Sequence, residues 1–71
     1  MHLPRKLVRQ ILDLIPEIIE HEDPRLPFTD RELTGELSKA LGTELTENMV
    51  YRYRRSLGIP RSGIRKRTTN G

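Results

Sequence analysis

The apolar residues of this 71-residue chain fall into three segments with helical spacing, and prolines and glycines separate the segments. Spacings of three and four residues place side chains on one face of an α-helix. The chain has no cysteine, which excludes disulfides and thiolate metal sites, so its small core must rest on helix packing. We therefore expect an all-α fold: a small three-helix bundle that contains a helix-turn-helix and ends in a basic tail.

The first segment begins at Leu3-Pro4. Pro4 suits a first helical turn, whereas Pro16 lacks an N–H and disfavours the α conformation at Ile15. We therefore expect an amphipathic helix that is kinked or split near Ile15, followed by a loop over residues 21–27, where two prolines lie close together. The apolar positions of the segment are Leu7, Val8, Ile11, Leu12, Leu14, Ile15, Ile18 and Ile19.

The second segment opens with the spacing of a capping box, in which the side chains of Thr29 and Glu32 bond each other's backbone N–H groups. This predicts a helix from about Asp30 to Leu41, ended by Gly42. Gly35 inside a helix costs about 1 kcal/mol relative to alanine, and we interpret it as a packing position where another helix approaches closely. The predicted apolar stripe consists of Leu33, Leu37, Ala40 and Leu41.

The third segment starts at Thr46, a good helix cap, and predicts a helix from about Glu47 to Leu57. Gly58 ends it, and Ile59 takes the apolar position of a C-terminal glycine cap. We expect a helical domain over residues 1–60, with the helix-turn-helix at about 29–58, and a flexible basic tail over residues 61–71. The predicted inward-facing residues of the third helix are Met49, Val50, Tyr53 and Leu57.

Charge is distributed unevenly along the chain. Residues 1–50 hold six basic residues against ten acidic ones, a net charge of −4, whereas residues 51–71 hold seven basic residues and no acidic one. Six of those seven are arginines, whose fork of donors matches phosphates and guanine edges. The C-terminal third is therefore expected to face a polyanion. The alternative is a solvated basic tail that serves solubility.

The outer face of the third helix is polar, as a recognition helix in the major groove requires. Glu47 can accept from a cytosine amino group, Asn48 can bridge an adenine, and arginines can reach guanine or phosphate. An ordinary charged helix on a three-helix bundle is the competing interpretation. The predicted DNA-binding residues are Thr46, Glu47, Asn48, Tyr51, Arg52, Arg54, Arg55, Arg61, Ser62, Arg65, Lys66 and Arg67.

Two stretches carry a family resemblance: EDPRLPFTD at residues 22–30 and YRYRRSLGIP at residues 51–60, supported by Glu32-Leu33, Glu36-Leu37, Val50, Ser62 and Arg65-Lys66. Over about Ile11 to Arg67 the chain resembles the C-terminal DNA-binding domain of bacterial sigma-54 factors. The resemblance implies that residues 46–55 form the family's signature box, which lies in the major groove at a GG-containing promoter element. Promoter DNA is then the expected partner, and RNA polymerase is a second one if the chain is part of a complete sigma factor.

The chain departs from this family at the start of the box. Glu47 and Asn48 stand where the family has consecutive arginines, and Met49 stands where it has a threonine. Val50, Tyr53 and Arg54 match, and Arg52 replaces a lysine. Because a carboxylate repels phosphate and cannot donate to guanine, the DNA sequence that this chain prefers is expected to differ from the usual element.

Other functions find less support in the sequence. We expect no enzyme, because His2 and His21 have no nucleophile or ligand partner at a recognisable spacing, and we expect neither a cofactor nor a bound metal. No segment is apolar enough for a membrane, which fits a cytoplasmic protein without a small-molecule substrate. The main alternative is a protein interaction module that uses the apolar first helix. The sequence leaves open whether this is an excised domain or a stand-alone protein.

Overall fold

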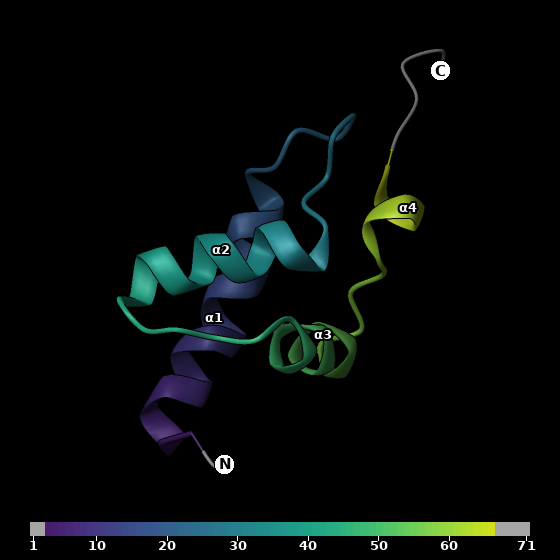
Figure 1. The fold of residues 1–71 in the computed structure, drawn as a ribbon. Helices are drawn as coiled ribbons and strands as arrows, with labels where there is room; N and C mark the ends of the chain where they lie inside the picture. Colours follow the sequence, from purple (N-terminus) through teal and green to yellow (C-terminus); the bar gives the residue numbers. More distant parts are fainter. Residues whose placement is uncertain (1–2, 67–71) are drawn as a thin grey trace.

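The structure is a computed structural model that describes residues 3–66, and Figure 1 shows its four helices. They are α1 (Arg5–Glu20), α2 (Asp30–Leu41), α3 (Glu47–Ser56) and the short α4 (Ser62–Arg65). None of the described residues forms a strand, and the all-α prediction is confirmed. In Figure 1, α3 is seen along its axis while α2 lies across the picture, so the two helices cross steeply, as in a helix-turn-helix. Within residues 3–66, no helix has the length and apolar character needed to cross a membrane.

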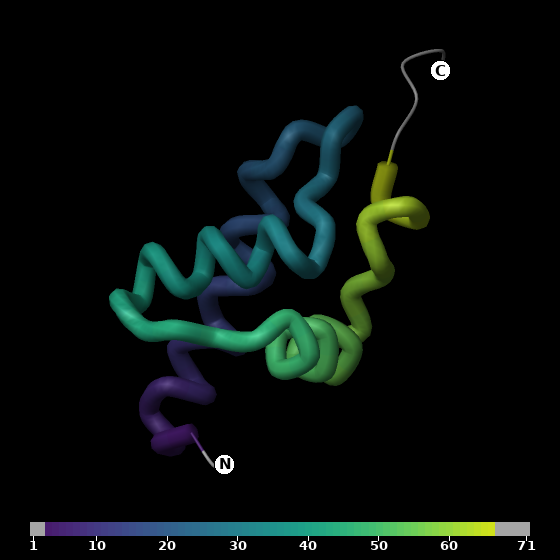
Figure 2. Tube along the Cα trace, viewed as in Figure 1, coloured from purple at the N-terminus to yellow at the C-terminus, as the bar shows by residue number. Residues whose placement is uncertain are grey.

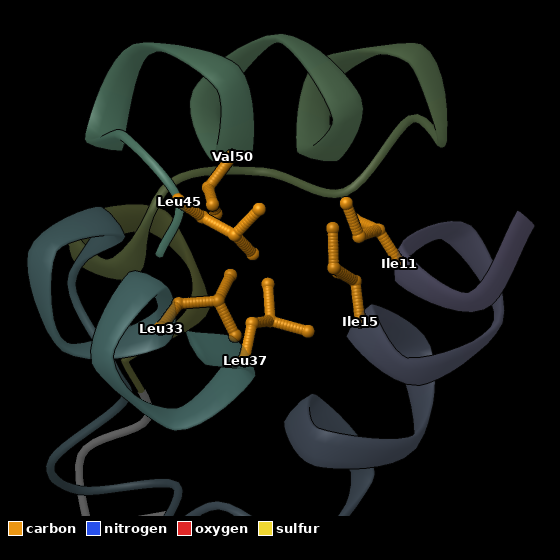
Figure 3. Packing of buried hydrophobic residues seen from close by; sticks show 6 residues of the cluster. All are labelled: Ile11, Ile15, Leu33, Leu37, Leu45 and Val50. Atoms are coloured by element: carbon orange, nitrogen blue, oxygen red, sulfur yellow. The ribbon is translucent and has the colours of Figure 1, made fainter. Parts of the chain in front are cut away.

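The core lies where α1, α2 and α3 meet, and each of the three packs against the other two. Figure 3 shows its buried side chains, which point toward one another from the three helices and from the turn before α3. A buried aliphatic side chain stabilises a fold by about 1.5–3 kcal/mol relative to an exposed one, so each member of this small set matters. The core residues are Ile11, Ile15, Leu33, Leu37, Leu45 and Val50.

The predicted break in the first helix is wrong, because α1 runs without interruption through Pro16. Pro16 lies on the exposed side of α1, so its ring does not enter the core. Ile11 and Ile15 are fully buried on one side of the proline, and Ile18 packs against the core on the other. Packing on both sides of Pro16 therefore outweighs its helix-breaking cost of about 3 kcal/mol. The loop predicted at residues 21–27 follows α1.

The predicted ends of the second and third helices are correct to within one residue. Thr29 and Glu32 form the complete capping box, and α2 spans the predicted residues. Thr46 caps α3, which ends one residue before the predicted Leu57. Beyond α3 the N–H of Gly58 donates to the carbonyl of Arg55, and the N–H of Ile59 donates to the carbonyl of Arg54. These two bonds are the hydrogen-bond pattern of a Schellman cap.

Three predicted positions on the inner faces are corrected. Leu57 is 37% exposed, because the chain turns at Gly58 with a φ of 73° and Ile59 packs against the core instead. Ala40 is exposed, and Thr34, whose hydroxyl donates to the carbonyl of Asp30, completes the buried stripe of α2. Gly35 has open space around it: a Cβ there would meet no atom within 4 Å, so it is not a packing position.

The segment after α3 returns along the loop that precedes α2, as the yellow and blue parts of the tube show in Figure 2. The side chain of Arg65 joins the two segments by donating to both carboxylate oxygens of Glu22, at 2.9 and 3.0 Å. It also donates to the carbonyls of Phe28 and Pro60. The paired side chains are only 8% and 7% exposed. Neither α4 nor this contact was expected from the sequence, and residues 67–71 of the predicted tail lie outside the described part.

Gly35→Ala should raise the free energy of unfolding by about 0.5–1 kcal/mol, because alanine favours the helix and the space for its Cβ is open. Gly42→Ala is the matched control: it makes the same chemical change at a left-handed φ of 63°, and it should lower the free energy of unfolding. Urea unfolding of the three proteins measures both effects. Destabilisation by Gly35→Ala would restore the packing interpretation.

The Glu22 ion pair should make stability depend on pH. Burial by itself raises the pKa of Glu22, but the hydrogen bonds from Arg65 and from the Phe28 N–H, together with the charge of Arg65, hold this pKa below its ordinary value. A lowered pKa adds stability that is present above the unfolded-state pKa and is lost as the pH falls through the folded-state pKa. Unfolding of the parent chain and Glu22→Gln between neutral pH and about pH 3 tests this. The stability difference should be largest at neutral pH and shrink in acid; a difference independent of pH would contradict it.

Candidate nucleic-acid interface

The outer face of α3 and its cap present half of the twelve predicted DNA-binding residues. These six are exposed along one helix of ten residues and its cap. The side chains include a carboxylate, an amide, a phenol and two guanidinium groups, which between them offer acceptors and donors to base edges and phosphates. These residues are Thr46, Glu47, Asn48, Tyr51, Arg52 and Arg55.

The start of α3 is held by local interactions. The Thr46 hydroxyl oxygen accepts a hydrogen bond from the Met49 N–H at 3.2 Å. Glu47 lies in the first turn, where a negative charge interacts favourably with the helix dipole. Glu47 therefore has a structural reason for its charge in addition to the base-reading role that the sequence suggests.

Arg54 points into the protein and not toward a partner, and it is 4% exposed. Its Nε and Nη2 donate to the two carboxylate oxygens of Asp30, at 2.7 and 3.1 Å, and its Nη1 donates to the carbonyl of Ile59 at 2.7 Å. These contacts join α3 to the start of α2 and to the chain that follows α3. The sequence contained a signal for this position, because Arg54 lies one helical turn after the inward-facing Val50.

Two guanidinium groups lie close to the ring of Tyr51. The guanidinium carbon of Arg54 is 5.5 Å from the centre of its ring, and that of Arg55 is 5.7 Å away, both within the range of cation–π attraction. Nη1 of Arg55 also donates to the Tyr51 hydroxyl at 2.9 Å. The hydrogen bond and the charge interaction with Tyr51 raise the pKa of Arg55, which keeps its positive charge.

The predicted residues beyond α3 divide into two kinds. Arg61 and Lys66 are exposed and Ser62 is half-buried, all three on or beside α4. The guanidinium of Arg65 is instead occupied by Glu22 and two backbone carbonyls. Arg67 lies outside the described residues. The sequence gave no sign of the Arg65 contacts with Glu22 and Phe28, because these residues lie more than 35 positions away from Arg65.

A groove separates α3 from the segment that contains α4, and we call it the α3–α4 groove. Two of its exposed residues, Arg55 and Arg61, are positively charged. Its position beside the outer face of α3 makes it continuous with the polar surface described above. The lining residues are Tyr51, Arg54, Arg55, Gly58, Ile59, Pro60, Arg61 and Ile64.

A second groove lies between α1 and α3 and is more apolar. It includes side chains of α1 that the core does not cover completely, among them Val8 and Leu12. Most of the remaining apolar face of α1 is used inside the domain, since Ile11 and Ile15 are fully buried. The lining residues are Leu3, Val8, Leu12, Met49, Arg52, Tyr53 and Ser56.

His21 and its acidic neighbours have separate contacts. Nδ1 of His21 donates to the carbonyl of Glu17 at 2.9 Å, which satisfies the end of α1, and Glu22 is paired with Arg65. Asp23 accepts from the N–H of Arg25. Over residues 3–66, no three histidine or acidic side chains are grouped as a metal site would require, and His2 lies outside that range.

Comparison with known proteins agrees with the predicted resemblance. A family model described as the sigma-54 DNA-binding domain matches residues 5–67. The RNA polymerase sigma-54 factor of Cereibacter sphaeroides is 40% identical over 57 residues, which make up 80% of this chain and 13% of that protein. No solved structure matches significantly. The matched family is a DNA-binding domain and not an enzyme, as the sequence led us to expect. Since the family match covers nearly all of its length, the chain belongs to the sigma-54 DNA-binding domain family.

Proposed function

We propose that this chain binds double-stranded promoter DNA in a sequence-specific manner, with α3 in the major groove. The observation that carries the proposal is the exposed polar face of α3, whose first turn presents Glu47 and Asn48. Residues near the start of a recognition helix meet base edges, and those farther along meet phosphates. The α2–α3 pair supplies the helix-turn-helix that this docking requires.

The charge of the exposed residues supports DNA as the partner. Arg52, Arg55, Arg61 and Lys66 are exposed on α3 or near α4, where they can approach the sugar-phosphate backbone. Arg54 and Arg65 contribute in a different way, because their ion pairs hold α3 and the following segment in place. We assign these two arginines to the support of the interface.

The setting of this activity follows from the family. We propose that the chain acts in transcription initiation, as part of a sigma-54-type factor or as a relative of one, in the cytoplasm. RNA polymerase would then be a partner of the complete factor, through sequence outside these 71 residues.

Protein binding through α1 is the second candidate function, and the apolar α1–α3 groove favours it. DNA binding has the stronger support, because the buried isoleucines of α1 serve the domain's own core. The two functions are separable, since variants on the outer face of α3 should affect DNA binding and leave the groove lined by Val8 and Leu12 unchanged.

Duplex binding should weaken steeply as salt concentration rises, because each phosphate contact releases condensed counterions. Changing Arg61 and Lys66 together to alanine should weaken binding to all sequences alike and reduce the slope of log affinity against log salt by up to about 2. Titration of labelled duplexes at several salt concentrations measures both effects. Salt-independent binding by the parent chain, or a changed sequence preference in the variant, would contradict this prediction.

The double variant Glu47→Arg, Asn48→Arg should favour GG-containing promoter duplexes over scrambled ones by about tenfold or more, since each two-bond arginine–guanine contact discriminates by about 1–3 kcal/mol. The matched control is Gln10→Arg with Glu17→Arg, which makes the same charge change at exposed positions of α1. Competition titrations at one salt concentration compare the three proteins, and thermal melts check that the folds are intact. If the α3 variant binds both duplexes more tightly by the same factor, positions 47 and 48 do not read bases.

A further inference from the structure

The Tyr51 ring lies close to two cations of α3, the buried guanidinium of Arg54 and the exposed guanidinium of Arg55. Asp30 and the Ile59 carbonyl hold the guanidinium of Arg54 in place, and that guanidinium lies 5.5 Å from the centre of the Tyr51 ring. The ring therefore has a fixed neighbour inside the protein, although the residue is 39% exposed. An exposed tyrosine without such a neighbour would be free to change its side-chain rotamer.

The ordered Tyr51 ring in turn orders Arg55. The hydroxyl accepts from Nη1 of Arg55 at 2.9 Å, and the guanidinium carbon stays 5.7 Å from the ring centre. Among residues 3–66, Tyr51 is the hydrogen-bond partner of this guanidinium, so Nε and Nη2 are available to a ligand with two acceptor oxygens. A side chain that is already held in place loses less conformational entropy when it binds.

The location of Arg55 indicates which part of DNA it meets. It lies in the last turn of α3, away from the first turn that approaches base edges, and it lines the α3–α4 groove together with Arg61. We infer that Tyr51 is a positioning residue that holds Arg55 as an anchor for a DNA backbone phosphate at this groove. The inference rests on the proposed function and adds to it a specific phosphate contact and the residue that orders it.

A double-mutant cycle on duplex DNA tests the inference, with Tyr51→Phe, Arg55→Ala and the combination of the two. Tyr51→Phe keeps the ring and removes the hydrogen-bond acceptor, and it should weaken binding about two- to tenfold through the extra cost of ordering Arg55. Arg55→Ala should weaken binding to GG-containing and scrambled duplexes alike, and it should reduce the slope of log affinity against log salt by about 1. The combined variant should bind no more weakly than Arg55→Ala, because the effect of Tyr51 acts through Arg55.

Two controls accompany the cycle. Tyr53→Phe removes the hydroxyl of the other tyrosine of α3, on the side that faces α1, and should leave the affinity unchanged. Tyr51→Phe combined with Arg52→Ala should show additive losses, since within residues 3–66 the side-chain hydrogen bond and the cation–π contact of Tyr51 and Arg55 do not involve Arg52. Thermal melts should be the same for the parent and Tyr51→Phe proteins.

Each contrary outcome has a distinct meaning. If Tyr51→Phe weakens binding by the same factor in the parent chain and in the Arg55→Ala variant, Tyr51 contacts DNA itself and the inference is overturned. It is also overturned if Tyr51→Phe has no effect, or if Arg55→Ala changes the preferred sequence, while the proposed function stands in all three cases. If the parent chain binds neither duplex at low salt, the proposed function fails, and this inference fails with it.

Discussion

The buried guanidinium of Arg54 is the interaction on which the placement of α3 depends. It connects three separate parts of the chain: its own helix, the first residue of α2 through Asp30, and the turn after α3 through the Ile59 carbonyl. A charged group taken out of water is tolerated only where its donors are satisfied, so the surrounding chain must keep these acceptors in position. The angle between the two helices of the helix-turn-helix is fixed by directional bonds as well as by apolar packing.

The hydrophobic core and the Arg54–Asp30 ion pair stabilise the fold in different ways. Aliphatic contacts are non-directional and hold α1, α2 and α3 together, but six buried side chains define the relative rotation of three helices only loosely. The polar contacts of Arg54 and Arg65 lie at the side of the molecule where the chain passes from α3 to α4. Apolar burial thus supplies compactness, and the two arginines fix the geometry of the side that carries the candidate interface.

The parts of the fold that the sequence predicted are those encoded over a few neighbouring residues. The capping box at Thr29, the cap at Thr46 and the glycine turn at Gly58 each depend on local hydrogen bonds, so their spacing is sufficient to identify them. The continuity of α1 through Pro16 was not predictable in this way, because it depends on how α1 packs against α2 and α3. The same holds for the partner of Arg65, since nothing near position 65 indicates that Glu22 lies beside it.

The exposed residues of the candidate interface were mostly found from the helical period, which places Asn48, Tyr51, Arg52 and Arg55 on one side of α3. The period places Arg54 one turn after the inward-facing Val50, but its residue type suggested a DNA contact, as it did for the neighbouring Arg55. The contact between Tyr51 and Arg55 was also missed, although a spacing of four residues on a helix allows it.

Two acidic residues far from α3 in the sequence reduce the positive charge that is displayed beside the candidate interface. Asp30 and Glu22 each neutralise one arginine inside the fold, so the loss of either carboxylate would release a cation toward the surface while it weakened the domain. Attraction to any polyanion would then increase, while the fixed arrangement of side chains that distinguishes one DNA sequence from another would be lost. The two carboxylates therefore bear on the balance between selective and general attraction as well as on folding, although neither residue lies on α3.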